Sequence, residues 1–168
     1  IGMHGTDASA KAFRRADAVI ACGMRFSDRV AGDRVKFRAG KTVIQFDIDA
    51  AEIDKNVPVD IAVMADIDEI LKALLPTLKQ ADRKDWLKET AAYKEYEAAN
   101  FDSSLPAYKI LSALRSFTDA DTPVVTDVGQ HQMWAAQYCR IERPRRFISS
   151  GGLGTMGFGL GAAMGACV

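Results

Sequence analysis

The sequence predicts an α/β fold in which helices cover parallel sheets, and three observations support this class. Short apolar runs rich in β-branched residues recur along the chain, and most of them end at a glycine or an acidic residue. Stretches with the apolar spacing of one helical face alternate with these runs. Strands and amphipathic helices that alternate in this way are typical of parallel sheets. We therefore expect parts of two parallel-sheet domains.

The first half of the chain supplies three predicted strands and two predicted helices. Residues 8–16 fit a helix, and the apolar run 17–23 fits a buried strand. Residues 41–49 and 60–64 are the next expected strands. Across 66–78, apolar residues recur every three or four positions, which predicts a helix with one buried face. This alternation indicates the latter part of one α/β domain.

A junction separates this part from a second α/β unit. Residues 81–100 have helical spacing with dense charge, and 100–106 are rich in turn residues. In the second unit we expect a helix at 107–117, a strand at 123–127, a helix at 130–138, a strand at 146–149 and a helix from 160 onward. The expected organisation is therefore one domain part at 1–80, a linker with a helix at 81–105, and a second domain part at 106–168.

Composition narrows the classes of function. The 168 residues are 48% hydrophobic and 26% charged with a formal net charge of +0, which gives no reason to expect a nucleic acid or an anionic membrane as partner. No apolar run reaches the roughly 18 residues that a membrane span needs. Cys22, Cys139 and Cys167 lie far apart among apolar neighbours, so we expect reduced core thiols without metal-ligand spacing.

A glycine-rich run at 151–161 follows the last predicted strand. Gly152-x-Gly154-x-x-Gly157 matches the dinucleotide-binding pattern, but a tight strand-to-helix turn explains the same glycines equally well. Met156 within the run favours a ligand, because a large flexible apolar side chain between glycines can support a ring. The alternative is that Met156 fills space in the core.

A second unusual string, Gly129-Gln130-His131, follows the predicted strand 123–127 and begins a helix. Backbone N–H groups at a helix start, with Gln and His beside them, suit a phosphate or diphosphate. The helix dipole adds only about 0.3–1 kcal/mol per charge. His131 taken alone is more often structural than a ligand. Two such turns at strand ends in one α/β unit favour a binding site.

Acidic residues end the strands of the first half. Asp47, Asp49 and Asp66 suit ribose hydroxyls, because a carboxylate only accepts hydrogen bonds. Capping of a helix is the alternative, above all for Asp66, which directly precedes a helical pattern. Arg25 follows the strand 17–23 and is a candidate for a ligand contact or for an ion pair with one of these acids.

A basic cluster precedes the glycine run and raises the question of nucleic acid. Its members are Arg140, Arg143, Arg145 and Arg146. Stacking aromatic residues are not interleaved with them, and the chain as a whole is neutral. We expect a solvated loop with local ion pairs.

Several strings together resemble those of the acetolactate synthase (acetohydroxyacid synthase) large catalytic subunit, a thiamine-diphosphate-dependent enzyme family. The strings are Gly2-Met3-His4-Gly5-Thr6, Arg25-Phe26-x-Asp28-Arg29-Val30-x-Gly32, Phe46-Asp47-Ile48-Asp49-x-x-Glu52-Ile53-x-Lys55-Asn56, Thr126 to Gln137, and Ser150 to Leu160. They occur in the family's order and cover nearly the whole chain. The resemblance implies an internal fragment: 1–80 from the FAD-binding middle domain and 106–168 from the start of the thiamine-diphosphate-binding domain.

The resemblance also implies roles for individual residues. Those matching the FAD site are His4, Gly23, Arg25, Asp47, Ile48 and Asp66. Those matching the thiamine diphosphate site are Gln130 and His131 at the diphosphate, Gly154 at the aminopyrimidine, and Met156 under the bend of the cofactor. Asp28 and Arg29 match positions that line the substrate channel. Departures from the family pattern at Ser27, Ala31, Ala65 and Gly161 affect loop shape.

The implied reaction is decarboxylation of pyruvate and carboligation to a second 2-keto acid, pyruvate or 2-ketobutyrate, in branched-chain amino-acid synthesis. The implied cofactors are thiamine diphosphate, Mg²⁺ and FAD, and the implied assembly is a homodimer or larger, with a possible regulatory small subunit, in the cytoplasm or a plastid. The family's catalytic glutamate and magnesium motif match no residue here, so we expect no catalytic or metal residue in this fragment and no activity from it alone.

Other readings stay open on the residues alone. Another thiamine-diphosphate carboligase or decarboxylase shares the general pattern, although the Gln130 to Trp134 string favours acetolactate synthase. A nicotinamide-dependent oxidoreductase would use the glycine pattern at 152–157. A non-catalytic homologue is the third alternative.

Overall fold

The computed structural model describes all 168 residues and divides into two compact units. Unit 1 comprises Ile1–Met3 and Asp7–Ala99, and unit 2 comprises His4–Thr6 and Asn100–Val168. Both contain parallel strands connected through helices. The predicted α/β class with parallel sheets is therefore confirmed.

Unit 1 contains a three-stranded parallel sheet in the order β1-β2-β3. The strands are β1 (Ala18–Cys22), β2 (Thr42–Asp47) and β3 (Ile61–Met64). The three strands are paired in register, with Ile20 opposite Ile44 and Ile44 opposite Ile61. All three carboxyl ends therefore lie at one edge of the sheet, which in open α/β sheets is where ligands bind.

The predicted helices of unit 1 are present, one of them shorter than expected, and two short helices that the sequence did not predict, α2 (Asp28–Ala31) and α3 (Arg34–Arg38), lie between the first two strands. The predicted helices are α1 (Asp7–Arg15), α4 (Ile67–Leu74) and α5 (Lys84–Ala99), and 3₁₀ turns lie at Gly2–His4, Ala50–Glu52 and Leu75–Thr77. The helix expected over 66–78 ends at Leu74, because Pro76 cannot donate a backbone hydrogen bond.

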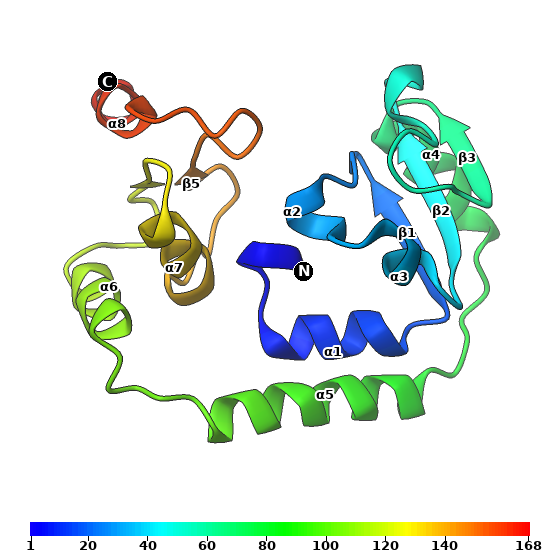
Figure 1. Ribbon diagram of the computed structural model, residues 1–168, viewed down its shortest axis with the longest axis horizontal. Helices are drawn as coiled ribbons and strands as arrows, with labels where there is room; N and C mark the ends of the chain where they lie inside the picture. Colours follow the sequence, from blue (N-terminus) through cyan, green and yellow to red (C-terminus); the bar gives the residue numbers. More distant parts are fainter. The chain divides into compact units, whose positions relative to one another are not determined.

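The long helix α5 packs along α1 within unit 1 (Figure 1). The Arg15 guanidinium donates to Glu89 Oε1 at 3.0 Å, and the Asp7 N–H donates to Glu97 Oε1 at 2.8 Å. Lys11 lies 4.1 Å from the centre of the Tyr96 ring. These contacts explain the dense charge along this helix: the polar residues tie α5 to its neighbour.

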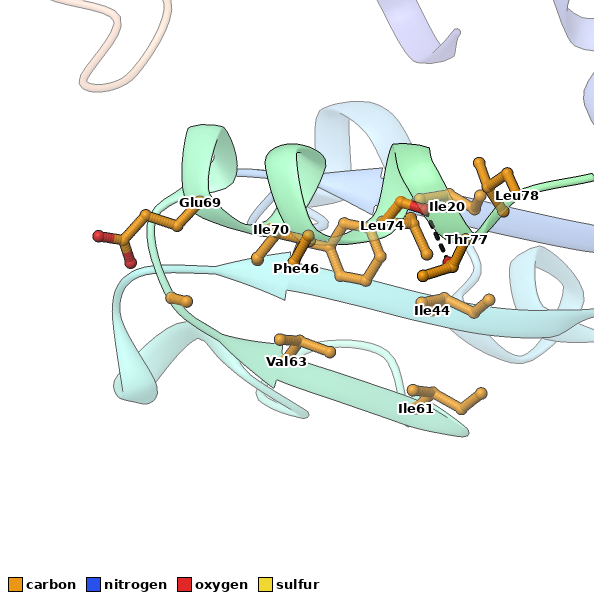
Figure 2. A pocket seen from close by; sticks show the side chains of 12 residues that line it. Ile20, Ile44, Phe46, Ile61, Val63, Glu69, Ile70, Leu74, Thr77 and Leu78 are labelled. Carbon is orange, nitrogen blue, oxygen red and sulfur yellow. Dashed lines mark hydrogen bonds between the residues drawn. The ribbon is translucent and has the colours of Figure 1, made fainter.

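The two faces of the unit 1 sheet differ. One face packs on the buried core, a cluster that includes Val43, Phe26 and Phe37, in which the two rings meet edge to face. The other face carries Ile44 and Ile61 beneath α4 and leaves an open apolar groove of about 670 Å³ (Figure 2). Alternate residues of each strand point to opposite faces, so apolar residues at consecutive positions serve both faces.

Unit 2 is built from shorter elements. They are α6 (Pro106–Ser116), β4 (Val124–Val125), α7 (Gln130–Tyr138), β5 (Phe147–Ile148) and α8 (Phe158–Ala166). The strands β4 and β5 pair in parallel, with Val124 opposite Phe147. The rings of Tyr108 and Tyr138 meet edge to face where α6 packs on α7. The predicted strands here are longer than the observed ones, since only two residues of each form the ladder.

The cysteine prediction is correct at one position and wrong at two. Cys139 is buried, and burial raises the pKa of its thiol. Cys22 and Cys167 are exposed free thiols. Cys22 lies on the sheet face that is only partly covered, and Cys167 follows the exposed helix α8, so apolar neighbours in sequence did not ensure burial. None of the helices is both long and apolar enough to cross a membrane.

Candidate functional site

The loop after β1 is held in an unusual backbone conformation. Gly23 has a φ of 58°, and Phe26 has a φ of 48° although it is 2% exposed. The Gly23 N–H donates to the Phe46 carbonyl at 2.8 Å, and the Asn56 side-chain amide donates to the Arg25 carbonyl at 2.8 Å. A Cβ at Gly23 would meet no atom within 4 Å. The main chain beside Arg25 is thus fixed and open to a ligand.

Two acids end β2 and the turn after it. Asp47 is buried, and its Oδ1 accepts from the Asp49 N–H at 3.0 Å. Asp49 accepts from the Ala51 N–H at 2.9 Å and begins the 3₁₀ turn Ala50–Glu52. Ile48 between them is exposed. Asp49 therefore acts as a cap, whereas Asp47 shapes the turn that presents Ile48.

Asp66 follows β3 and caps helix α4. Its carboxylate accepts from the Asp68 N–H at 2.8 Å. Capping of a helix was the alternative to a ribose contact that the sequence left open for Asp66, and the structure shows this cap. Since a cap uses one carboxylate oxygen, it does not by itself prevent a contact with a ligand hydroxyl.

The structure brings most of the predicted flavin residues to one edge of the sheet. Gly23 and Arg25 follow β1, Asp47 and Ile48 follow β2, and Asp66 follows β3. His4 belongs to unit 2 and is not grouped with them. This edge, with open main chain at Gly23, fits an extended dinucleotide.

The predicted substrate-channel residues lie in the short helix α2. Asp28 and Arg29 are both exposed, and the carboxylate of the first lies 3.6 Å from the guanidinium of the second. Gly2, with a φ of 70°, packs against this helix: a Cβ there would lie 2.5 Å from the Arg29 carbonyl oxygen. The pair is therefore held on a helix that the N-terminal residues approach closely.

Sequence reasoning missed Gln45, which is fully buried beneath the same edge. Its amide nitrogen donates to the carbonyls of Met24 and Glu52, both at 3.1 Å, and its oxygen accepts from the Asp54 N–H at 3.3 Å. Gln45 thus joins the loop after β1 to the loop after β2. A polar residue inside an otherwise apolar strand was the signal that could have found it.

In unit 2, the first candidate turn follows β4 and leads into α7. Gly129 has a φ of 147° and directly precedes the helix. Gln130 and His131 occupy the first turn of α7, and both are exposed. The first turn contains no acidic residue. The N–H of Gln132 donates to the Gly129 carbonyl at 3.1 Å, and the Asp127 carboxylate is near enough to interact with His131. A helix start of this kind can present N–H groups to a diphosphate.

The second candidate turn follows β5 and leads into α8. The Gly154 N–H donates to the Ser150 carbonyl at 2.9 Å, and the Thr155 N–H donates to Ser150 Oγ at 3.0 Å. Gly154 and Gly157 have φ values of 64° and 86°. A Cβ at Gly154 would meet no atom within 4 Å, so its main chain is open to a ring. The side chain of Met156 is 84% exposed.

One carboxylate joins the two turns. Asp127 Oδ1 accepts from the N–H groups of Val128 at 2.8 Å and Gly157 at 3.0 Å, and Oδ2 accepts from the N–H of Gly159 at 2.9 Å. Hydrogen bonds from Gly159, Val128 and Gly157 hold the pKa of the Asp127 carboxyl below its ordinary value. The two turns therefore lie on the same side of the β4–β5 pair.

Buried polar groups reinforce this junction. Ser149 Oγ accepts hydrogen bonds from the Thr126 hydroxyl and from the side-chain amide of Gln132. Thr126 and Gln132 are both buried. These contacts connect the end of β4, helix α7 and the start of the second turn. The Gln137 amide also donates to the Gly5 carbonyl at 3.1 Å within unit 2.

The basic cluster forms local ion pairs, as predicted. Arg140 pairs with Glu142 at 2.9 Å, and Arg143 and Arg146 share Asp121 at 3.4 Å and 3.3 Å. Metal ligation finds no support in this chain, because no group of three His, Cys, Asp or Glu residues is placed to hold an ion.

Comparison with known proteins identifies the class. Residues 1–74 match the family described as thiamine pyrophosphate enzyme, central domain, and residues 127–168 match the thiamine pyrophosphate enzyme C-terminal TPP binding domain. Thiamine pyrophosphate is the same compound as thiamine diphosphate. The chain therefore belongs to the thiamine pyrophosphate enzymes and spans parts of their middle and C-terminal domains.

Within this class, the chain is similar over its whole length to acetolactate synthase large subunits. It is 42% identical over 171 residues to the acetolactate synthase large subunit of Lactococcus lactis, covering 98% of this chain and 29% of that protein. It is 44% identical over 172 residues to the isozyme 2 large subunit of Escherichia coli K12, covering 100% and 31%. A probable acetolactate synthase large subunit of Methanocaldococcus jannaschii is 41% identical over 180 residues, covering 100% and 30%. The chain thus spans about 30% of the length of these relatives.

Proposed function

We propose that the protein carrying this segment is an acetolactate synthase, which decarboxylates pyruvate and joins the product to a second 2-keto acid. The observation that carries the proposal is the pairing of two open turns at the ends of β4 and β5, joined through Asp127. The identity of 42–44% to two large subunits over 98–100% of the chain supports the same reading. Pyruvate and 2-ketobutyrate are the proposed substrates.

In this proposal, unit 2 holds thiamine diphosphate. Gln130 and His131 bind the diphosphate at the start of α7, where the N-terminal end of the helix favours negative charge. The Gly154 carbonyl accepts from the aminopyrimidine, and Met156 supports the apolar side of the cofactor. The bound cofactor supplies the nucleophilic carbon, while these residues orient it and exclude water.

Unit 1 is the proposed FAD-binding part. Gly23 leaves room for the dinucleotide, Arg25 contacts it, and the carboxylates of Asp47 and Asp66 accept from its hydroxyls. Ile48 supplies an apolar contact beside them. His4 is proposed as an FAD contact on the sequence resemblance alone, and Asp28 with Arg29 are proposed to line the substrate channel.

The proposed domain assignment follows the same reading. Residues 1–80 belong to the FAD-binding middle domain, 81–105 form a linker with a helix, and 106–168 begin the thiamine-diphosphate-binding domain. The complete protein is proposed to use Mg²⁺ through residues outside these 168, to act in the cytoplasm, and to form a homodimer or larger assembly, with which a regulatory small subunit can associate. Because the family's catalytic glutamate and magnesium motif match no residue of the chain, the 168 residues alone are proposed to be inactive.

The complete subunit tests the proposed function. Acetolactate formation from pyruvate is measured with thiamine diphosphate, Mg²⁺ and FAD, and again with each cofactor omitted. We expect turnover that requires thiamine diphosphate, and a raised half-saturating cofactor concentration in Met156→Ala. Gly161→Ala is the matched control in the same glycine-rich region, because a Cβ there would meet no atom within 4 Å. A complete subunit that binds no thiamine diphosphate would overturn the proposed function. Pyruvate turnover by the 168-residue chain would overturn the claim that this chain alone is inactive.

A further inference from the structure

Within the two candidate turns, Asp127 makes the hydrogen bonds that span the greatest separation in sequence. It lies two residues after β4, and its carboxylate reaches the N–H groups of Gly157 and Gly159, which lie 30 and 32 residues further along the chain. From the sequence alone, Asp127 is predicted only as the last residue of the strand 123–127, without a functional role. Its contacts place it between the residues proposed to hold the diphosphate and those proposed to hold the aminopyrimidine.

The hydrogen-bond pattern requires both carboxylate oxygens. Oδ1 accepts from the N–H groups of Val128 and Gly157, and Oδ2 accepts from the N–H of Gly159. Three donors therefore converge on one side chain, which only an acceptor with two oxygens can satisfy. An asparagine would turn its NH₂ group toward one of these N–H donors. Hydrogen bonds to an ionised acceptor are also roughly twice as strong as neutral ones.

Packing at Gly159 holds the same two segments together. A Cβ at Gly159 would lie 2.8 Å from the Asp127 backbone nitrogen and 3.1 Å from its Cβ. The first turn of α8 therefore lies directly against Asp127, in the loop that follows β4. Two residues further along the same helix, a Cβ at Gly161 would meet no atom within 4 Å. Among the glycines of α8, only Gly159 approaches the Asp127 backbone this closely.

We propose that Asp127 is a positioning residue for thiamine diphosphate, which fixes the distance between the Gln130–His131 turn and the Gly154–Met156 turn. This inference rests on the proposed function, because it concerns the same cofactor. Asp127 acts through the backbone of Gly157 and Gly159 and contacts no reacting atom. A cofactor held at its two ends by separate turns binds in one shape only when the spacing of those turns is fixed.

The first test concerns the contact alone and needs no cofactor. Asp127→Ala and Asp127→Asn are made in the complete subunit, and amide hydrogen exchange is followed on peptides covering 157–159. We expect faster exchange in Asp127→Ala, and an intermediate rate in Asp127→Asn, because asparagine keeps one of the two acceptor oxygens. Unchanged exchange in both variants would overturn the inference.

The second test concerns the cofactor. We expect Asp127→Ala to weaken thiamine diphosphate binding by about 10- to 100-fold, by analogy with the loss found when a residue that orients a metal ligand is removed. The half-saturating thiamine diphosphate concentration should rise and kcat should fall, while the KM for pyruvate stays unchanged. A purely structural role would lower the amount of folded enzyme without moving the cofactor constant.

The glycine pair supplies a variant that leaves Asp127 intact. Gly159→Ala forces α8 away from Asp127, whereas Gly161→Ala adds the same methyl group to open space in the same helix. Gly159→Ala should therefore weaken cofactor binding in the same direction as Asp127→Ala, and Gly161→Ala should bind like the wild type. Equal cofactor constants for the two alanine variants would overturn the inference.

The outcomes distinguish a failure of the proposed function from a failure of the inference about Asp127. Should the wild-type subunit fail to bind thiamine diphosphate, both the proposed function and the inference are overturned. Should the wild type bind it and Asp127→Ala bind it equally well, only the inference is overturned. Weaker binding in Asp127→Ala and Gly159→Ala, with Gly161→Ala unchanged, supports the positioning role.

Discussion

The acids at the strand ends of the two units perform different tasks. In unit 1, Asp49 and Asp66 accept from backbone N–H groups only two residues away, and each begins the element that follows it. In unit 2, Asp127 accepts from N–H groups 30 and 32 residues away and joins two turns. A short-range acid determines where one element begins, whereas a long-range acid determines the spacing between two elements.

The two units also differ in how deeply their candidate sites are buried. Unit 1 has a packed core around Val43 and Phe26, and its candidate edge is built on that core. In unit 2, helix α8 contains no buried residue, and the turn carrying Met156 is exposed. The geometry of the unit 2 turns therefore depends on hydrogen bonds more than on packing, which makes the two sites sensitive to different substitutions.

The largest expected effect tests the packed core of unit 1. Phe26→Ala removes a ring that is 2% exposed and lies edge to face with Phe37 at 5.7 Å. We expect the free energy of unfolding to fall by about 3–5 kcal/mol. Phe117→Ala in unit 2 is the matched control, because that ring is 86% exposed. Urea unfolding measures both, and a loss under about 1 kcal/mol for Phe26→Ala would contradict the assignment of the core.

A smaller loss is expected at the buried amide of unit 1. Gln45→Leu leaves the carbonyls of Met24 and Glu52 and the N–H of Asp54 without their partner. Unsatisfied buried groups cost about 1–3 kcal/mol each, and partial hydration of the loops keeps the expected total near 2–3 kcal/mol. Thermal unfolding checks this against Gln80→Leu at an exposed position. Equal stability of the two variants would show that Gln45 does not hold the loops.

Sequence patterns predicted what depends on neighbours along the chain. Strand and helix alternation gave the α/β class, and the position of Asp66 before an apolar-periodic stretch predicted its cap. The same patterns assigned Cys22 to the core, because they could not show which face of β1 is left partly open.

Contacts between residues distant in sequence were not predictable in this way. Gln45 appeared only as a polar residue in an apolar strand, and Asp127 only as the end of one. Their partners become neighbours through the parallel pairing of β2 with its flanking strands and of β4 with β5. The candidate turns were found from composition, whereas the groups that fix their spacing required the fold.

A third prediction separates the two roles left open for Asp66. Asp66→Ala removes the cap of α4 and should lower the free energy of unfolding by about 1 kcal/mol, whereas Asp66→Asn keeps a good cap and should change it by a few tenths. If the carboxylate also accepts from a flavin hydroxyl, Asp66→Asn lowers flavin affinity while stability is kept. Flavin content after dialysis and urea unfolding are measured together. Unchanged flavin affinity in both variants would leave Asp66 a cap alone.

The smallest expected effect tests whether Asp127 joins the two turns through its negative charge, or whether a neutral oxygen acceptor would serve equally well. Hydrogen bonds from Gly159, Val128 and Gly157 lower the folded-state pKa of this carboxyl. A lowered folded pKa means that the stabilisation is fully present above the unfolded value of about 3.9 and is lost as the pH falls through the folded value. The stability difference between wild type and Asp127→Asn should therefore be constant near neutral pH and shrink below about pH 4. Because Asp127 is only half-buried, salt should weaken the difference too. A difference that persists unchanged into acid would mean that shape, and not charge, joins the two turns.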